Sequence, residues 1–195
     1  MVQALGEALL PLATAQGFPL DRTRGMGLRG WARAMQGQDE VGLAQLRQGM
    51  TAVVAMGQEV SRPFGRILLA AGAGHLGQVD EGLRLLAEAR TALEANTQGD
   101  RLEEAYRLQG ELLLRQTTPD VAQAEACFQQ ALTMARQQRA KSWELRATMR
   151  LSRLGQQQGK RAEAREVLAP ISGWCTEGFD TADLQGAKVL LEALA

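Results

Sequence analysis

Two glycine-rich segments of the chain have the G-x-G-x-x-G spacing that binds phosphates in dinucleotide-binding folds. They run from Gly25 to Gly30 and from Gly72 to Gly77. In such folds the glycines follow a strand and let backbone amides approach a pyrophosphate, and an acidic residue about 20 positions on binds the ribose. Residues 67–71 can pass for a strand. Residues 78–107, however, are helical in pattern, so no second strand is predicted to position the acidic residue. A nucleotide-binding enzyme that uses Gly72, Gly74 and Gly77 is therefore a remote alternative.

His75 is the one histidine of the chain and its one side chain with an ordinary pKa near neutrality. No serine or cysteine close in sequence makes an evident nucleophilic pair with it. One histidine and two cysteines cannot supply four zinc ligands without carboxylates, and the chain has no G-x-x-x-x-G-K-[ST] phosphate loop. We therefore expect a protein that is not an enzyme and uses no cofactor and no metal.

Arginine and glutamate recur at helical spacing in the second half of the chain. Glu104, Arg107, Glu111 and Arg115 follow one another at three- or four-residue intervals. The planar guanidinium of arginine fits carboxylate and phosphate groups, which predicts an acidic ligand. The alternative is that these charges neutralise one another across one solvated helix face.

The composition excludes two classes of partner, nucleic acid and membrane. The 195 residues carry 22 Lys and Arg against 22 Asp and Glu, so there is no net charge and no basic block of the kind that binds nucleic acid. No stretch is apolar enough to predict a membrane span or a signal peptide. Two cysteines without a redox or metal spacing suit a reducing compartment. We expect a cytoplasmic protein that binds neither nucleic acid nor membrane.

The apolar residues favour an all-α protein. The chain holds 31 Ala and 29 Leu but only 9 Val and 2 Ile, and sheets prefer β-branched side chains. Apolar residues return at i, i+3, i+4 and i+7, and Gly17, Gly37, Gly57, Gly77, Gly99 and Gly159 mark helix ends. Ser61, Asp100 and Thr118 mark helix starts. The predicted helices lie near 2–16, 21–36, 39–56, 61–76, 79–95, 100–116, 119–138, 141–158, 161–169 and 181–194.

The predicted helices repeat in pairs. In the second helix of each pair a small residue recurs at intervals of 40, 42 and 40 residues, at Gly42, Gly82, Ala124 and Ala164. The first helices carry small residues at matching positions, at Gly30, Ala70, Gly110 and Ser152. Two antiparallel helices interlock closely only where the crossing lacks bulk, so we expect these sites at helix crossings.

This pattern resembles the tetratricopeptide repeat, whose usual period is about 34 residues. The resemblance implies a right-handed α-solenoid with a concave groove lined by the first helices. Projecting these helices gives a partner-binding set of Trp31, His75, Glu104, Arg107, Glu111, Arg115, Arg146, Met149 and Arg153. Core packing is the alternative for Trp31.

The resemblance extends to the carboxy-terminal end, where Ser142 to Ala147 and Gly173 to Leu184 stand. These segments look like the end of the repeat region in bacterial signalling proteins that contain a predicted ATPase with a class III adenylate cyclase or a transcription-activating domain. The resemblance implies a single helical-repeat domain over 1–195, cut from a larger protein. Its parts are a helix of a preceding repeat at 1–17, helix pairs at 21–56, 61–95, 100–138 and 141–171, and a capping segment at 173–195.

The expected function is a non-catalytic interaction or sensor module that regulates an attached or partner ATPase or cyclase. Its partner is a protein or peptide, an acidic one if the arginines bind it, or a small effector. Self-association as a homodimer is the alternative. Because the last repeat must hide an apolar face that has no neighbour, we expect Trp174 and Phe179 to fold back over the last pair.

Overall fold

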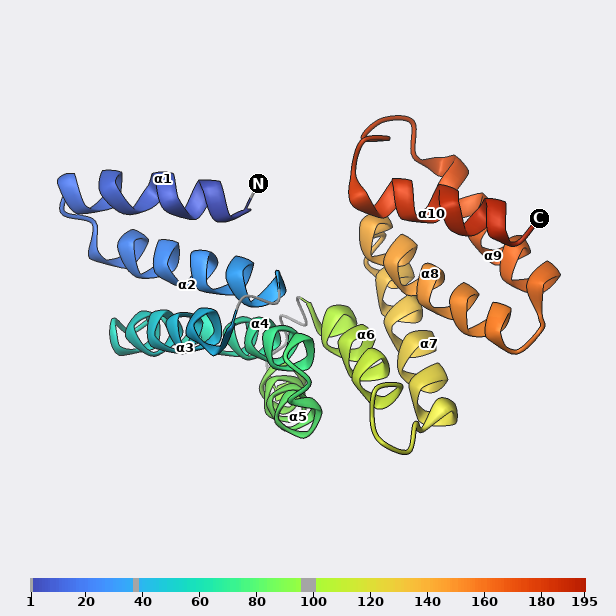
Figure 1. Ribbon diagram of the computed structural model, residues 1–195, viewed down its shortest axis with the longest axis horizontal. Coiled ribbons are helices and arrows are strands. Elements are labelled where there is room, and N and C mark those ends of the chain that lie inside the picture. The colour runs from blue at the N-terminus through green and yellow to red at the C-terminus, as the bar shows by residue number, and fades with distance from the viewer. Residues whose placement is uncertain (1, 37–38, 96–100) are drawn as a thin grey trace. The chain divides into compact units, whose positions relative to one another are not determined.

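The computed structural model describes residues 2–36, 39–95 and 101–195 (Figure 1). Across these ranges it contains ten α-helices, one short 3₁₀ helix and no strand. The all-α expectation is confirmed. Residues 67–71, which the nucleotide-binding alternative requires as a strand, lie inside a helix. None of the helices in the described ranges has the length and apolar character needed to span a membrane.

The chain divides into two compact units, residues 1–99 and 100–195. Unit 1 contains α1 (Val2–Ala15), α2 (Pro19–Met35), α3 (Asp39–Ala55), η1 (Glu59–Ser61), α4 (Arg62–His75) and α5 (Val79–Ala95). Unit 2 contains α6 (Leu102–Leu113), α7 (Val121–Gln137), α8 (Lys141–Gln157), α9 (Arg161–Trp174) and α10 (Ala182–Ala193).

Consecutive helices pack as pairs within each unit, which gives a helical repeat-like fold. The pairs are α2 with α3, α4 with α5, α6 with α7, and α8 with α9. The first helices of successive pairs also meet, α2 with α4 in unit 1 and α6 with α8 in unit 2. Helix α10 packs against both α8 and α9.

The helix ends follow local backbone chemistry. Gly17, Gly57, Gly77 and Gly159 all have a positive φ just beyond a helix, which confirms them as stop residues. Gly37, Gly99 and Asp100 lie outside the described residues. Ser61 makes no side-chain cap, and α7 is capped by Asp120, whose Oδ1 accepts from the amide of Gln123 at 2.9 Å. The predicted start of that helix at 119, with Thr118 as its cap, is therefore wrong.

Helix α9 is longer than predicted, since it continues beyond residue 169 to Trp174. Pro170 lies inside it, where proline removes one backbone hydrogen bond but keeps a helical φ. The buried Ile171 holds the next turn against the core of unit 2. Packing therefore carries the helix past its predicted end at residue 169.

Small residues stand at helix crossings, as predicted. A Cβ placed on Gly30 would lie 2.6 Å from the carbonyl oxygen of Gly42, and one on Gly42 would lie 2.8 Å from that of Gly30. A Cβ on Gly110 would lie 2.6 Å from the Phe128 ring. In the last pair the hydroxyl of Ser152 donates to the carbonyl oxygen of Ala164 at 3.0 Å. Close approach at these positions is therefore confirmed, and Gly82 and Ala124 are buried.

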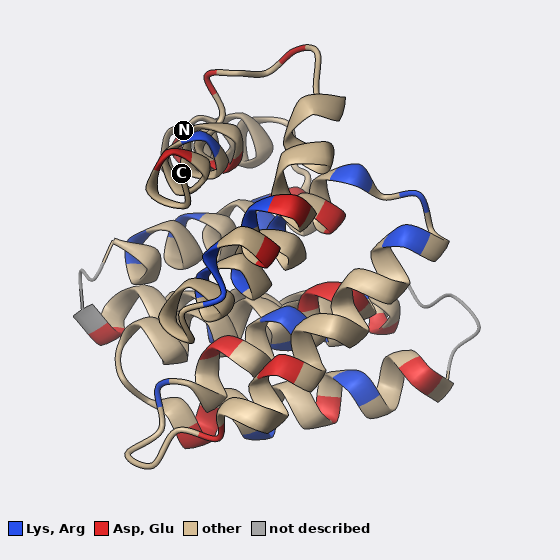
Figure 2. Ribbon diagram, turned by 90° about the vertical axis from the view of Figure 1, so that its right-hand side faces the viewer, with Lys and Arg blue, Asp and Glu red and all other residues tan. Residues whose placement is uncertain are grey.

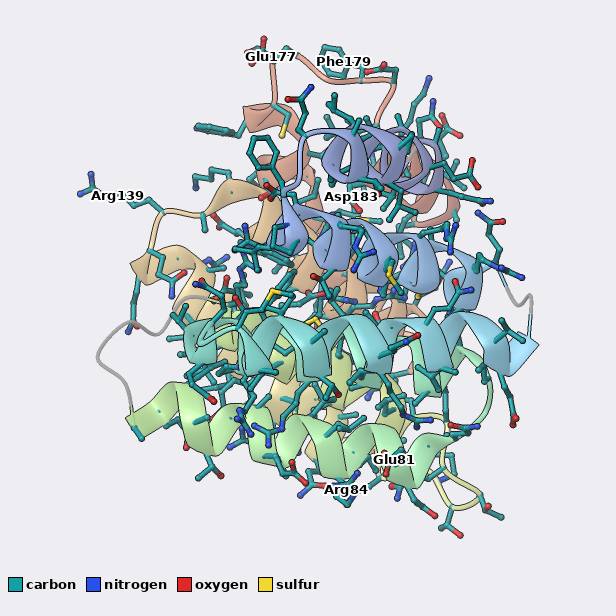
Figure 3. All side chains as sticks on the ribbon, turned by 90° about the vertical axis from the view of Figure 1, so that its left-hand side faces the viewer. Glu81, Arg84, Arg139, Glu177, Phe179 and Asp183 are labelled. Atoms are coloured by element: carbon teal, nitrogen blue, oxygen red, sulfur yellow. The ribbon has the colours of Figure 1, made fainter. Side chains whose placement is uncertain are left out.

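The cover of the last pair differs from the prediction. Trp174 is 60% exposed and Phe179 is 64% exposed, and Phe179 stands on the loop before α10 (Figure 3). Helix α10 covers the pair, contributing its buried residues to one apolar cluster with α8 and α9: Leu145, Met149, Ala164, Leu168, Ile171, Ala187, Leu190 and Leu194. A whole helix buries more apolar surface than two rings, so the expectation for Trp174 and Phe179 is wrong.

Candidate functional site

The nine predicted partner-binding residues are divided between the units. Trp31 and His75 belong to unit 1, and the other seven belong to unit 2. Trp31 is half-buried in α2, and its Nε1 has no hydrogen-bond partner among the described residues. His75 is exposed as the last residue of α4. Neither lines the pocket described next.

Unit 2 contains a polar pocket of about 260 Å³ between the α6, α8 and α10 helices. Four of the predicted residues line it, and they share the pocket with residues that were not predicted. The lining is Arg107, Arg146, Met149, Arg150, Arg153, Ala182, Asp183 and Gly186. We call this set the arginine pocket. Figure 2 shows basic and acidic positions interleaved along the helices of the chain.

Arg107 lines the arginine pocket and is held by two carboxylates of its own helix. Its Nε and Nη2 donate to Glu104 at 2.6 and 2.7 Å, and its Nη1 donates to Glu111. All three side chains are at most 15% exposed. Burial alone lowers the pKa of Arg107, but the hydrogen bonds and charges of Glu104 and Glu111 outweigh it and raise that pKa. The predicted pairing is confirmed, but the face is buried rather than solvated.

Glu111 is shared between two helices. The carboxylate oxygen that accepts from Arg107 also forms an ion pair with Nε of Arg150 in α8. Burial lowers the pKa of Arg150; the charge of Glu111 opposes this shift, and the charges of Arg107, Arg153 and Arg115 add to it. One carboxylate therefore serves two guanidiniums in a region crowded with positive charge.

Arg146 is fixed from two sides. Its Nε donates to Oδ2 of Asp183 in the first turn of α10 at 2.7 Å. Its guanidinium lies over the ring of Trp143, 4.8 Å from the ring centre. The contacts of one arginine thus join α8 to α10 at the pocket rim.

Arg153 has no hydrogen-bond or ion-pair partner within the part of the chain that the structure describes. Its Nη2 would lie 3.8 Å from a Cβ placed on Gly186, and the methyl of Met149 would lie 3.0 Å from it. The bare backbone of α10 at Gly186 leaves room for both side chains. Arg153 therefore offers its donors to the pocket.

Arg115 follows the end of α6 and is exposed, outside the lining of the arginine pocket. Arg150 and Asp183 were missed by sequence reasoning. Arg150 lies four residues after Arg146 and three before Arg153, so the helical spacing of α8 contained its signal. Asp183 is 37 residues from Arg146, and no local pattern connects them.

The chemistry of the arginine pocket is that of an anion receptor. Four arginines and one carboxylate line it, and none of the lining residues is Ser, Cys or His. Among the described residues, no group of three or more His, Cys, Asp or Glu side chains could hold a metal ion. No protein-family model matches the chain, and no curated protein matches it.

Proposed function

We propose that this chain is a non-catalytic binding module, a right-handed α-solenoid of tetratricopeptide-like helix pairs, that receives an acidic ligand at the arginine pocket. The observation that carries the proposal is the convergence of Arg107, Arg146, Arg150 and Arg153 on one pocket. Carboxylates of the chain pair with three of these guanidiniums, whereas Arg153 has no partner among the described residues, so its charge favours an added anion. The resemblance of the sequence to signalling proteins supports a cytoplasmic role in regulating an attached or partner ATPase or cyclase.

Binding of an acidic peptide tests this function. A fluorescein-labelled peptide of ten glutamates is titrated with the full chain, and its anisotropy is followed. We expect saturable binding that Arg153→Glu weakens by about tenfold or more, because the reversed charge repels the ligand. Arg165→Glu, on the exposed surface of α9, makes the same change of charge away from the pocket and is the matched control. Equal weakening by both variants, or no binding at all, would reject the acidic ligand.

Self-association is a second candidate, supported by helix α1. Leu5 and Leu12 are 63% and 59% exposed, and they lie two turns apart on one face of that helix. An apolar stripe of this kind is a candidate contact for a second copy of the chain. Light scattering coupled to size exclusion tests it: we expect a dimer that Leu5→Gln with Leu12→Gln converts to monomer. A monomer over a wide range of wild-type concentrations would remove this candidate.

A further inference from the structure

We propose that the arginine pocket is a site for a compact oxyanion of the phosphate class, and that the Asp183 carboxylate occupies the place that this anion takes. The inference rests on the proposed function and names its ligand class. When the anion binds, it displaces the Asp183 carboxylate from the guanidinium of Arg146.

Asp183 has the properties of an internal substitute for a ligand. Its carboxylate accepts from Arg146 at 2.7 Å, and it lines the same pocket as Arg150 and Arg153. The side chains of Asp183 and Arg146 are 37% and 39% exposed, and an ion pair exposed to this extent contributes little to stability. The pair can therefore open without disturbing the core of unit 2.

The arginines retain donors that Asp183 does not use. Arg153 has no ion-pair partner among the described residues, and Arg150 shares Glu111 with Arg107. Residues 146, 150 and 153 follow one another at helical spacing, so their side chains leave α8 on one face. A tetrahedral dianion offers more acceptor oxygens than a single carboxylate, and it can accept from all three at once.

The size of the pocket favours a small anion. Its volume of about 260 Å³ lies below the range of about 300–1,000 Å³ that drug-sized ligands occupy. A phosphate group fits such a space, either as the free ion or as the monoester of a small metabolite. A nucleotide or a folded partner would have to place only one charged group in it.

Exchange of Asp183 also connects the site to helix α10. Asp183 stands in the first turn of α10, and Ala187, Leu190 and Leu194 of the same segment cover the α8–α9 pair. A ligand that binds better when the Arg146–Asp183 pair is open shifts α10 toward that arrangement. The anion thereby controls the contact between α8 and the first turn of α10.

Trp143 provides a reporter because Arg146 lies over its ring. In the full chain with Trp31→Phe and Trp174→Phe, Trp143 is the remaining tryptophan. Its fluorescence is followed while sodium phosphate, glycerol phosphate, sodium sulfate or sodium chloride is added at constant ionic strength. Calorimetry on the wild-type chain gives the same affinities without the two substitutions.

We expect saturable binding of phosphate or glycerol phosphate and none of chloride. Arg153→Gln should weaken binding by about tenfold, because it removes a charged donor. Asp183→Asn should tighten it by about fivefold, because the internal competitor loses its charge. Asp180→Asn makes the same change of charge on the exposed loop before α10 and should leave the affinity nearly unchanged. Tighter binding of glycerol phosphate than of free phosphate identifies a monoester as the source, and the reverse order identifies the free ion.

Three outcomes would overturn the inference: no saturable binding of either phosphate compound, chloride binding as tightly as phosphate, or the same effect from Asp183→Asn and Asp180→Asn. If the glutamate peptide still binds and Arg153→Glu still weakens it, the proposed function stands while this inference fails. If neither probe binds, both fail.

Discussion

Arg146 of α8 and Asp183 of α10 are joined by a 2.7 Å hydrogen bond across 37 residues of sequence. The same guanidinium lies over the ring of Trp143, so its position is set by an aromatic face and by a carboxylate. The bond ties the start of α10 to the rim of the arginine pocket. A ligand that competes for Arg146 therefore acts on α10 as well.

A double-mutant cycle measures how strongly this pair is held. The chains compared are wild type, Arg146→Gln, Asp183→Asn and the double variant, each unfolded in urea. Because both side chains are more than a third exposed, we expect a coupling free energy below about 1 kcal/mol. A coupling of about 2 kcal/mol or more would mean that the pair behaves as a buried ion pair and resists exchange.

Arg107 should matter far more for stability than Arg146. Arg107→Gln leaves Glu104 and Glu111 charged and buried without their main partner, which predicts a loss of roughly 3–5 kcal/mol in the free energy of unfolding. The measurement is urea unfolding of the full chain followed by circular dichroism at 222 nm.

Arg84 is the matched control because it has the same arrangement on an exposed surface. It pairs with Glu81 three residues before it and with Glu88 four residues after it, and its side chain is 56% exposed (Figure 3). Arg84→Gln should move the unfolding midpoint much less, since water replaces the lost contacts. Equal losses for the two variants would show that burial of Arg107 adds nothing.

The sequence predicted the helices well and the site in part. Alanine and leucine periodicity located the ten α-helices of the described ranges, although the start of α7 and the end of α9 were misplaced, because that signal acts within one turn. The arginine face of α8 was visible at Arg146 and Arg153, since both lie on one helical stripe. Arg150 lies on the same stripe, so its place in the site could have been predicted from helical spacing.

The rest depended on tertiary packing. Asp183 reaches the pocket because α10 folds back over α8, and no local pattern specifies where a terminal helix returns. The burial of Arg107 with Glu104 and Glu111 could not be separated from a solvated face by spacing, since both arrangements have the same i, i+3 and i+4 pattern. The prediction that Trp174 and Phe179 cover the last helix pair was wrong. Aromatic residues often cover a core, but here helix α10 covers it.

Two glycines of α2 allow a test of close packing against α3. A Cβ on Gly30 would meet backbone atoms of α3 at 2.6 and 2.7 Å, so Gly30→Ala should destabilise the chain by about 1–3 kcal/mol. Gly27 lies on the same helix, and a Cβ there would lie 3.7 Å from Leu46. Gly27→Ala should be neutral or should stabilise by up to about 1 kcal/mol, because alanine favours the helix. The melting temperatures of the two variants test this difference. Equal changes would mean that Gly30 does not lie at a tight helix crossing.

We expect the ion pairs of Glu144 to make the stability of the folded chain depend on pH. Its carboxylate accepts from Lys141 at 2.7 Å and from Arg136 of α7 at 3.0 Å. Burial alone would raise the pKa of Glu144, but these hydrogen bonds outweigh it and bring that pKa below the ordinary value of 4.5. The unfolded chain then binds the proton more readily than the folded one, so this contribution is complete above about pH 4.5 and is lost as the pH falls through the folded pKa.

The expected difference in the free energy of unfolding between wild type and Glu144→Gln is about 1–2 kcal/mol at pH 7 and should shrink toward zero near pH 3. Urea unfolding at several pH values measures it, with Glu166→Gln on the exposed surface of α9 as the control for a lost charge. If the difference stays constant from pH 7 to pH 3, the shape of the Glu144 side chain stabilises the α7–α8 contact and its charge does not.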